Sequence, residues 1–96
     1  MYSGSNFKKE YHEIENRVVN TINNICRIME TNYKEIADVL ETDQAYIHKA
    51  LSRKKHLTFP LFLKICYALK EINKNKNFPY PDEELLPSRI LSKAGV

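Results

Sequence analysis

Apolar residues recur every three or four positions along the first third of the chain. Such spacing places side chains on one face of an α-helix, so it predicts a single helix from residue 5 to about residue 30. Val19 and Cys26 widen this stripe, and residues 18–29 are therefore expected to face the core. The narrower first half packs either on the chain's own tail or on a second copy. The members of the stripe are Phe7, Tyr11, Ile14, Val18, Ile22, Ile25 and Met29.

Two short helices are predicted next from their capping residues. Asn32, followed three residues later by Glu35, forms a capping-box pattern at the start of a helix that ends near Glu41. Asp43 is the next cap, because its carboxylate can accept the free backbone N–H groups of the turn that follows it. The sequence therefore predicts a helix, a tight break and a second helix over residues 43–53.

A fourth helix is predicted after Thr58, in which Pro60 is tolerated because its missing N–H has no helical partner in the first turn. This helix is apolar on most sides, so it forms either the centre of the core, covered by the tail, or a contact with another chain. After a polar linker, N-K-N-K-N, and the helix-breaking F-P-Y-P, Asp82 is expected to cap a short segment. Further apolar residues indicate that the tail docks on the core: Leu85, Leu86, Ile90 and Leu91.

These elements define an all-α fold, a compact bundle of four to five helices that contains a helix-turn-helix, with an extended first helix and a C-terminal tail. With 96 residues and 43% hydrophobic content, the chain has room for one domain with a modest core, which excludes a multi-domain enzyme. Along it we distinguish an N-terminal helical extension over residues 1–15, a helix-turn-helix domain over residues 16–72, and a linker with a C-terminal tail over residues 73–96.

The helix predicted over residues 43–53 has two unlike faces. With Ile47 at the centre of the buried side and an advance of about 100° per residue, Ala50 and Leu51 also face inward. The opposite face is small, polar and basic. It comprises Ala45, Lys49 and Ser52, flanked by His48 and Arg53, with Gln44 on the exposed first turn and Tyr46 at the border.

Positive charge is concentrated in the same part of the chain, although the net charge is only +3. Between Gln44 and Lys70 there are six Lys or Arg residues and no Asp or Glu. The rest of the chain contains the other nine of the fifteen basic residues and all twelve acidic residues. A merely solvated face usually mixes its charges, so this distribution favours a local anionic partner.

The segment from Tyr33 to Lys55, Y-K-E-I-A-D-V-L-E-T-D-Q-A-Y-I-H-K-A-L-S-R-K-K, resembles the helix-turn-helix of the Cro/phage-repressor group, also called the XRE family. The segment L-T-F-P-L-F-L-K-I-C-Y-A-L that follows is similar to the next helix of that family. The resemblance covers about residues 16–72 and implies a DNA-binding domain whose helix over residues 43–53 lies in the major groove. The matching apolar positions are Ala37, Leu40, Ile47 and Leu51.

The resemblance also implies roles for individual residues on this surface. Gln44 is chemically suited to adenine, and Lys49 is suited to guanine. The implied base-contacting residues are Gln44, Ala45, Tyr46, His48 and Lys49, and the implied contacts to the DNA backbone are Tyr33, Ser52, Arg53, Lys54, Lys55 and His56.

Two residues of the turn depart from the family pattern. Glu41 stands where the family usually has glycine, so a left-handed backbone there costs on the order of 1 kcal/mol and places a carboxylate near the DNA side. Thr42 replaces a larger aliphatic residue. These departures concern the geometry of the turn rather than the two helices beside it.

No pattern in the sequence indicates an enzyme, a metal site or a cofactor. The three histidines, His12, His48 and His56, lack a Ser, Cys or carboxylate at the spacing of a nucleophile and base, and none has metal-ligand spacing with a cysteine. Cys26 and Cys66 lie in separate apolar patterns and are expected to be buried thiols in a reducing cytosol. Because the chain has no run long enough for a membrane span and no signal-peptide pattern, we expect a cytoplasmic protein without membrane contact.

Two functions of different class remain open. The first is a sequence-specific double-stranded DNA-binding protein, a transcriptional regulator of the repressor type. We expect it to act as a homodimer on a palindromic operator, because one recognition helix with six nearby charges grips DNA weakly. The second is a helix-turn-helix protein-interaction module, such as a small inhibitor or antitoxin, with weak or no DNA binding. The broad apolar stripes, and the acidic Glu41 and Asp43 beside the outward face, favour this second function.

Overall fold

The structure of the protein, a computed structural model, describes residues 4–96, with side chains from residue 9 onward. The described residues form five α-helices and one 3-10 helix, without a strand, which confirms the predicted all-α fold. The elements are α1 (Gly4–Met29), α2 (Tyr33–Val39), α3 (Gln44–Leu51), α4 (Phe59–Asn73), the 3-10 helix η1 (Asp82–Leu85) and α5 (Pro87–Lys93).

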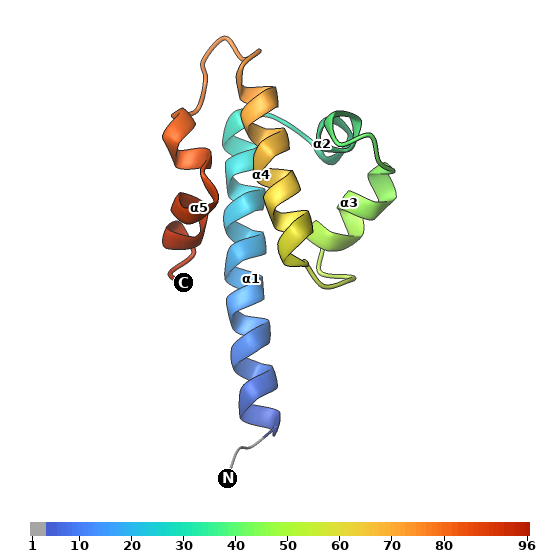
Figure 1. Ribbon diagram of the computed structural model, residues 1–96, viewed down its shortest axis with the longest axis vertical. Coiled ribbons are helices and arrows are strands. Elements are labelled where there is room, and N and C mark those ends of the chain that lie inside the picture. Colours follow the sequence, from blue (N-terminus) through green and yellow to red (C-terminus); the bar gives the residue numbers. More distant parts are fainter. Residues whose placement is uncertain (1–3) are drawn as a thin grey trace.

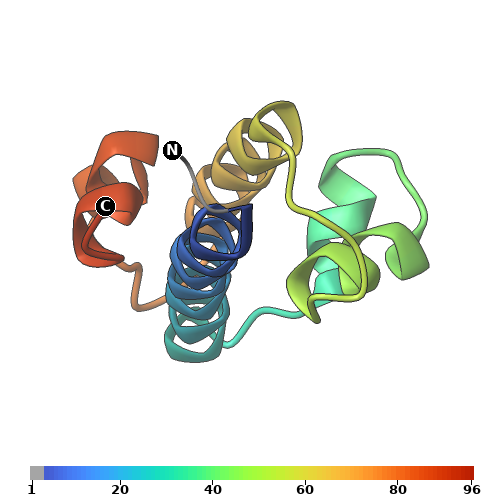
Figure 2. The same cartoon turned by 90° about the horizontal axis from the view of Figure 1, so that it is seen from below.

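The helices are arranged around α1, which runs through the middle of the molecule and extends beyond the other elements at its N-terminal end (Figure 1). Helix α4 lies beside α1 and runs in the same direction, whereas α5 returns in the opposite direction. Seen along α1, the α2–α3 pair and α5 lie on opposite sides of the α1–α4 layer (Figure 2). Because α1 continues without a break across residue 15, the predicted N-terminal extension and the domain after it share one helix.

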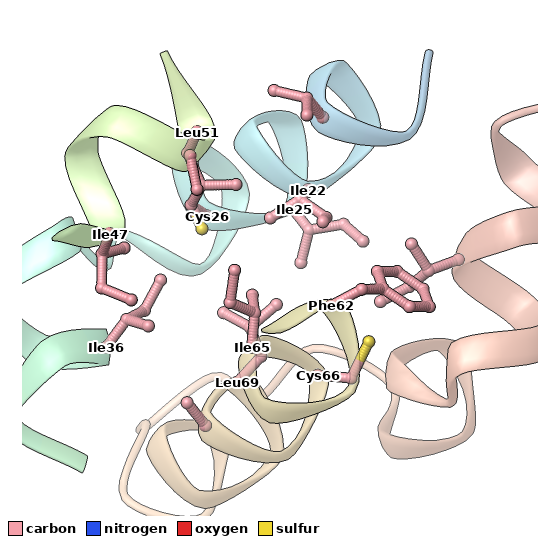
Figure 3. Packing of buried hydrophobic residues seen from close by; sticks show 14 of the residues in the cluster. Ile22, Ile25, Cys26, Ile36, Ile47, Leu51, Phe62, Ile65, Cys66 and Leu69 are labelled. Carbon is pink, nitrogen blue, oxygen red and sulfur yellow. The ribbon is translucent and has the colours of Figure 1, made fainter. Parts of the chain in front are cut away.

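The core lies between α1, α4 and the α2–α3 pair (Figure 3). Side chains from all four helices meet there, and the second half of the α1 stripe is buried as predicted, from Val18 to Met29. Tyr11 and Ile14, in the first half, are 47% and 36% exposed. Phe7 lies outside the residues whose side chains are described. The fully buried side chains at the centre include Ile22, Ile25, Ile36, Ile47, Leu51, Ile65 and Leu69.

Three of the predicted helix caps are confirmed. Each cap side chain accepts a backbone N–H of the first turn, and Pro60 stands in the first turn of α4. In the capping-box pattern, the Glu35 carboxylate accepts a hydrogen bond from the Thr31 hydroxyl at 2.7 Å. The cap bonds run from Glu35 N to Asn32 Oδ1 (2.9 Å), from Ala45 N to Asp43 Oδ1 (3.2 Å) and from Leu61 N to Thr58 Oγ1 (3.3 Å).

The fourth predicted cap, Asp82, is wrong. Pro81 precedes η1, and no side chain caps it. Asp82 instead accepts a hydrogen bond from Asn73 Nδ2 at 3.3 Å. Asn73, expected to begin a polar linker, is the buried last residue of α4, and its side chain bonds both the N–H (2.8 Å) and the C=O (2.7 Å) of Tyr80. A buried amide therefore fixes the start of the tail.

The tail docks as predicted, and α4 contributes buried residues to the core along its length. Leu85 and Ile90 are fully buried and Leu91 is partly buried, whereas Leu86 is exposed. Helix α5 packs on α1 and η1 packs on α4. Helix α4 still leaves three large apolar side chains exposed, Phe59, Leu63 and Tyr67.

Candidate nucleic-acid interface

Helix α3 divides its residues between core and solvent as its phasing predicts. Ile47, Ala50 and Leu51 are at most 2% exposed, so they fix the helix against α2 and α1. The outward residues, Gln44, Ala45, Tyr46, His48 and Lys49, are all exposed, and the cap residue Ser52 is exposed as well. The five predicted base-contacting side chains therefore share one accessible surface, which we call the α3 face.

A basic loop follows the α3 face. Lys54 and Lys55 are exposed, and their backbone N–H groups both donate to the carbonyl of Lys49, at 2.9 and 3.2 Å. This closure of the helix end sets Arg53 in the left-handed region, with φ of 67°. The Lys55 Nζ lies 4.0 Å from the centre of the Tyr46 ring, so a cation–π contact ties the loop to the α3 face. Among the described residues, Lys49 and Lys54 form no ion pair.

Glu15 of α1 contacts Arg53 and His56, two of the predicted phosphate contacts. Arg53 Nη1 lies 2.9 Å from Glu15 Oε1, an ion pair that lacks the alignment of a hydrogen bond. His56 Nδ1 is 3.2 Å from the same oxygen, and the Leu57 N–H donates to Glu15 Oε2 at 2.7 Å. Glu15 is only 7% exposed. The loop is therefore anchored on α1 by a buried carboxylate.

Burial alone raises the pKa of Glu15, but its partners outweigh that effect. The Leu57 N–H, the His56 ring and the Arg53 guanidinium all favour the charged carboxylate, so the pKa lies below its ordinary value of 4.5. Glu15 is thus ionised at neutral pH and offsets part of the positive charge of the loop.

Tyr33, also a predicted phosphate contact, is engaged inside the fold. Its hydroxyl donates to Asn23 Oδ1 at 2.8 Å, and Asn23 Nδ2 donates to the carbonyl of Leu51 at 2.8 Å. The Tyr33 ring also packs edge-on against His48, with ring centres 5.7 Å apart. Asn23, which the sequence pattern did not single out, therefore joins α1 to both α2 and α3 and sets the orientation of the α3 face.

The turn between α2 and α3 contains the expected strained residue. Glu41 has φ of 53°, in the left-handed region that favours glycine, and its side chain is exposed. The next N–H, of Thr42, donates to the carbonyl of Ala37 at 2.9 Å, which closes the end of α2. The backbone thus follows the path that glycine would take, and a carboxylate stands two residues before the cap of α3.

The cysteines offer no reactive site. Cys26 and Cys66 are buried and unpaired, and burial raises the pKa of their thiols to about 11 and about 12. Within residues 4–96 no group of His, Cys, Asp or Glu side chains is arranged to hold a metal ion. Over the same described range, no helix combines the length and apolar character that crossing a membrane requires.

Comparison of the chain with protein-family models, with curated proteins and with solved structures found no match.

Proposed function

We propose that the protein is a sequence-specific double-stranded DNA-binding protein, a transcriptional repressor that acts as a homodimer on a palindromic operator. Helix α3 lies in the major groove, and the loop after it contacts the flanking phosphates. The resemblance of residues 16–72 to the XRE family favours this function, and so does the arrangement of the side chains described above.

The observation that carries the proposal is the division of α3 into a buried anchor and an exposed reading face. Ile47 and Leu51 hold the helix rigidly, so Gln44 and Lys49 project from a fixed position. An exposed amide in the first turn of α3 and an exposed amine further along it are suited to hydrogen bonding with base edges in the major groove. The basic loop beside them supplies charge for phosphates, and no acid occurs from Gln44 to Lys70.

The basic residues of the loop are of two kinds. Lys54 and Lys55 are both exposed, with Lys55 Nζ over the Tyr46 ring, and they neutralise phosphates directly. Arg53 is ion-paired with Glu15, and His56 Nδ1 lies 3.2 Å from the same carboxylate, so both residues mainly fix the loop. Under this proposal, the largest loss of backbone affinity comes from the two lysines.

Salt dependence of DNA binding tests this assignment. On a duplex selected from a random pool, we expect the logarithm of the binding constant to fall linearly with the logarithm of the salt concentration. The substitution Lys54→Ala should reduce the slope by about one unit, because one phosphate contact is lost. Fluorescence anisotropy over a salt series measures both slopes.

The matched control is Lys74→Ala, which removes the same charge from an exposed lysine at the far end of α4. Its slope should equal that of the unmodified protein. Equal slopes for the Lys54→Ala and unmodified proteins would contradict the phosphate contact, and equal losses from both substitutions would indicate a general charge effect.

A second candidate function is a helix-turn-helix module that binds another protein, as a small inhibitor or antitoxin does. The exposed carboxylate of Glu41 beside the α3 face and the large apolar side chains exposed on α4 favour it. Failure to select any duplex, together with an intact fold, would favour this second function over the first.

A further inference from the structure

An apolar groove runs along α1 at the point where the helix leaves the body of the molecule. It has a volume of about 300 Å³ and lies between the start of α4 and α5. Helix α1 lines it with Tyr11, Ile14, Glu15 and Val18. The other lining side chains come from the loop before α4, from α4 and from α5: Leu57, Phe59, Phe62 and Leu91. Phe59 is 65% exposed, so a large apolar surface faces solvent here.

The chain's own tail covers only part of the α1 stripe. Leu91 of α5 reaches the groove, and Gly95 lies beside the Arg17 side chain. Tyr11 and Ile14 remain 47% and 36% exposed, toward the end of α1 that extends beyond the other elements (Figure 1). The first half of the stripe is expected to pack either on the tail or on a second copy. Because the tail covers only part of it, there is room for a second copy.

The charges beside the stripe are complementary to those of a second, antiparallel α1. Glu10 and Arg17 are seven residues apart, so they lie on the same side of the stripe, and among the described residues neither has an ion-pair partner. An antiparallel pair of α1 helices centred between Tyr11 and Ile14 brings Glu10 of each copy beside Arg17 of the other. Because a two-fold dimer is symmetric, the attraction between Glu10 and Arg17 occurs twice, once from each copy.

A parallel pair would be disfavoured. If Tyr11 and Val18 are the a positions of a heptad and Ile14 is the d position, then Glu10 occupies g and Glu15 occupies e. Parallel helices place g of one chain against e of the other, so two carboxylates would face each other. Glu15 is in addition buried against the loop and cannot turn away.

We propose that a second copy of this chain occupies the groove, with the two α1 helices antiparallel and paired through Glu10 and Arg17. This inference rests on the proposed function, because it names the surface that joins the two copies required by a two-fold operator. Leu57 and Phe59 follow directly on the basic loop, so a copy seated in the groove lies next to the loop and the C-terminal end of α3.

Sedimentation equilibrium of the full chain without DNA tests the inference. The unmodified protein should show twice the 11.3 kDa mass of the chain, and Ile14→Glu should show the mass of one chain. The reversals Glu10→Arg and Arg17→Glu should each raise the dimer dissociation constant about tenfold or more, and the two reversals combined should restore it. The matched control is Phe78→Glu, at an apolar side chain that is 96% exposed and does not line the groove.

Circular dichroism checks that each variant stays helical, and the charge reversals affect only exposed side chains. A single-chain mass for the unmodified protein at every concentration would overturn the inference, as would a dimer that survives Ile14→Glu. If the two reversals combined do not restore the dimer dissociation constant, the antiparallel pairing is overturned. A monomer that still selects a DNA duplex would overturn this inference and the homodimeric part of the proposed function, and would leave DNA binding standing. A dimer that selects no duplex would support the pairing of α1 and contradict DNA binding.

Discussion

Glu15 is the residue whose environment differs most from what its sequence position indicates. It stands among other charged residues beside the apolar stripe of α1, where an exposed carboxylate is expected. The structure instead buries it and gives it three partners from the loop after α3. Its charge therefore stabilises the contact between α1 and the proposed phosphate-binding loop.

The substitution Glu15→Gln should lower the free energy of unfolding at neutral pH by about 1 to 2 kcal/mol, because a neutral amide binds Arg53 and the Leu57 N–H less strongly. The folded-state pKa of Glu15 is lowered, so its contribution is fully present above about pH 4.5 and is lost as the pH falls through the folded-state pKa. Urea unfolding at neutral pH and at pH values below 4.5 measures the difference, which should shrink on acidification.

Glu13→Gln is the control for this prediction, because Glu13 is an exposed carboxylate on the same helix. It should leave the free energy of unfolding almost unchanged at both pH values. A destabilisation by Glu15→Gln that is the same at neutral and acidic pH would show that the carboxylate charge is not what anchors the loop.

At the scale of the elements, the turn between α2 and α3 places a non-glycine residue in the left-handed region of the backbone. A glutamate at φ of 53° is strained, and under the proposed function its carboxylate would repel an approaching phosphate. Both effects arise from Glu41, and two substitutions separate them.

We expect Glu41→Gly to stabilise the fold by about 0.5 to 1 kcal/mol, since relief of the left-handed strain exceeds the entropy that glycine adds to the unfolded chain. Glu41→Gln should leave stability unchanged and strengthen DNA binding. Thermal unfolding and anisotropy titration measure the two effects. If Glu41→Gln binds the selected duplex no more tightly, the carboxylate does not face the DNA.

The elements were largely predictable because they depend on local signals. The periodic stripe of α1, three helix caps and the two faces of α3 follow from residues that are close together in the sequence. The roles of Glu15, Asn23 and Asn73 were not predictable, because their partners lie at a distance along the chain or depend on how the linker folds back. The local sequence favours Asp82 as a helix cap. The competing hydrogen bond from Asn73 forms only when the linker folds back, so the local sequence does not reveal it.

At the scale of the molecule, α1 connects the parts that the proposed function requires. Its buried half carries the core, and Asn23 and Glu15 fix the α3 face and the loop beside it. Its exposed half carries the groove for the proposed second copy. Under the proposed function, a change at Asn23 or Glu15 of α1 should therefore affect DNA binding through the α3 face and the loop that these residues hold.

Selection of duplexes from a random pool by the 96-residue chain tests the central claim most directly. At about 100 mM salt, where non-specific phosphate contacts are weakened, we expect one sequence to be enriched, with two inverted half-sites about one helical turn apart. Selection with Lys49→Ala should enrich sequences with a different base preference within each half-site, because a base contact is lost. Enrichment of no sequence by a folded protein would contradict the claim that this chain reads DNA through α3.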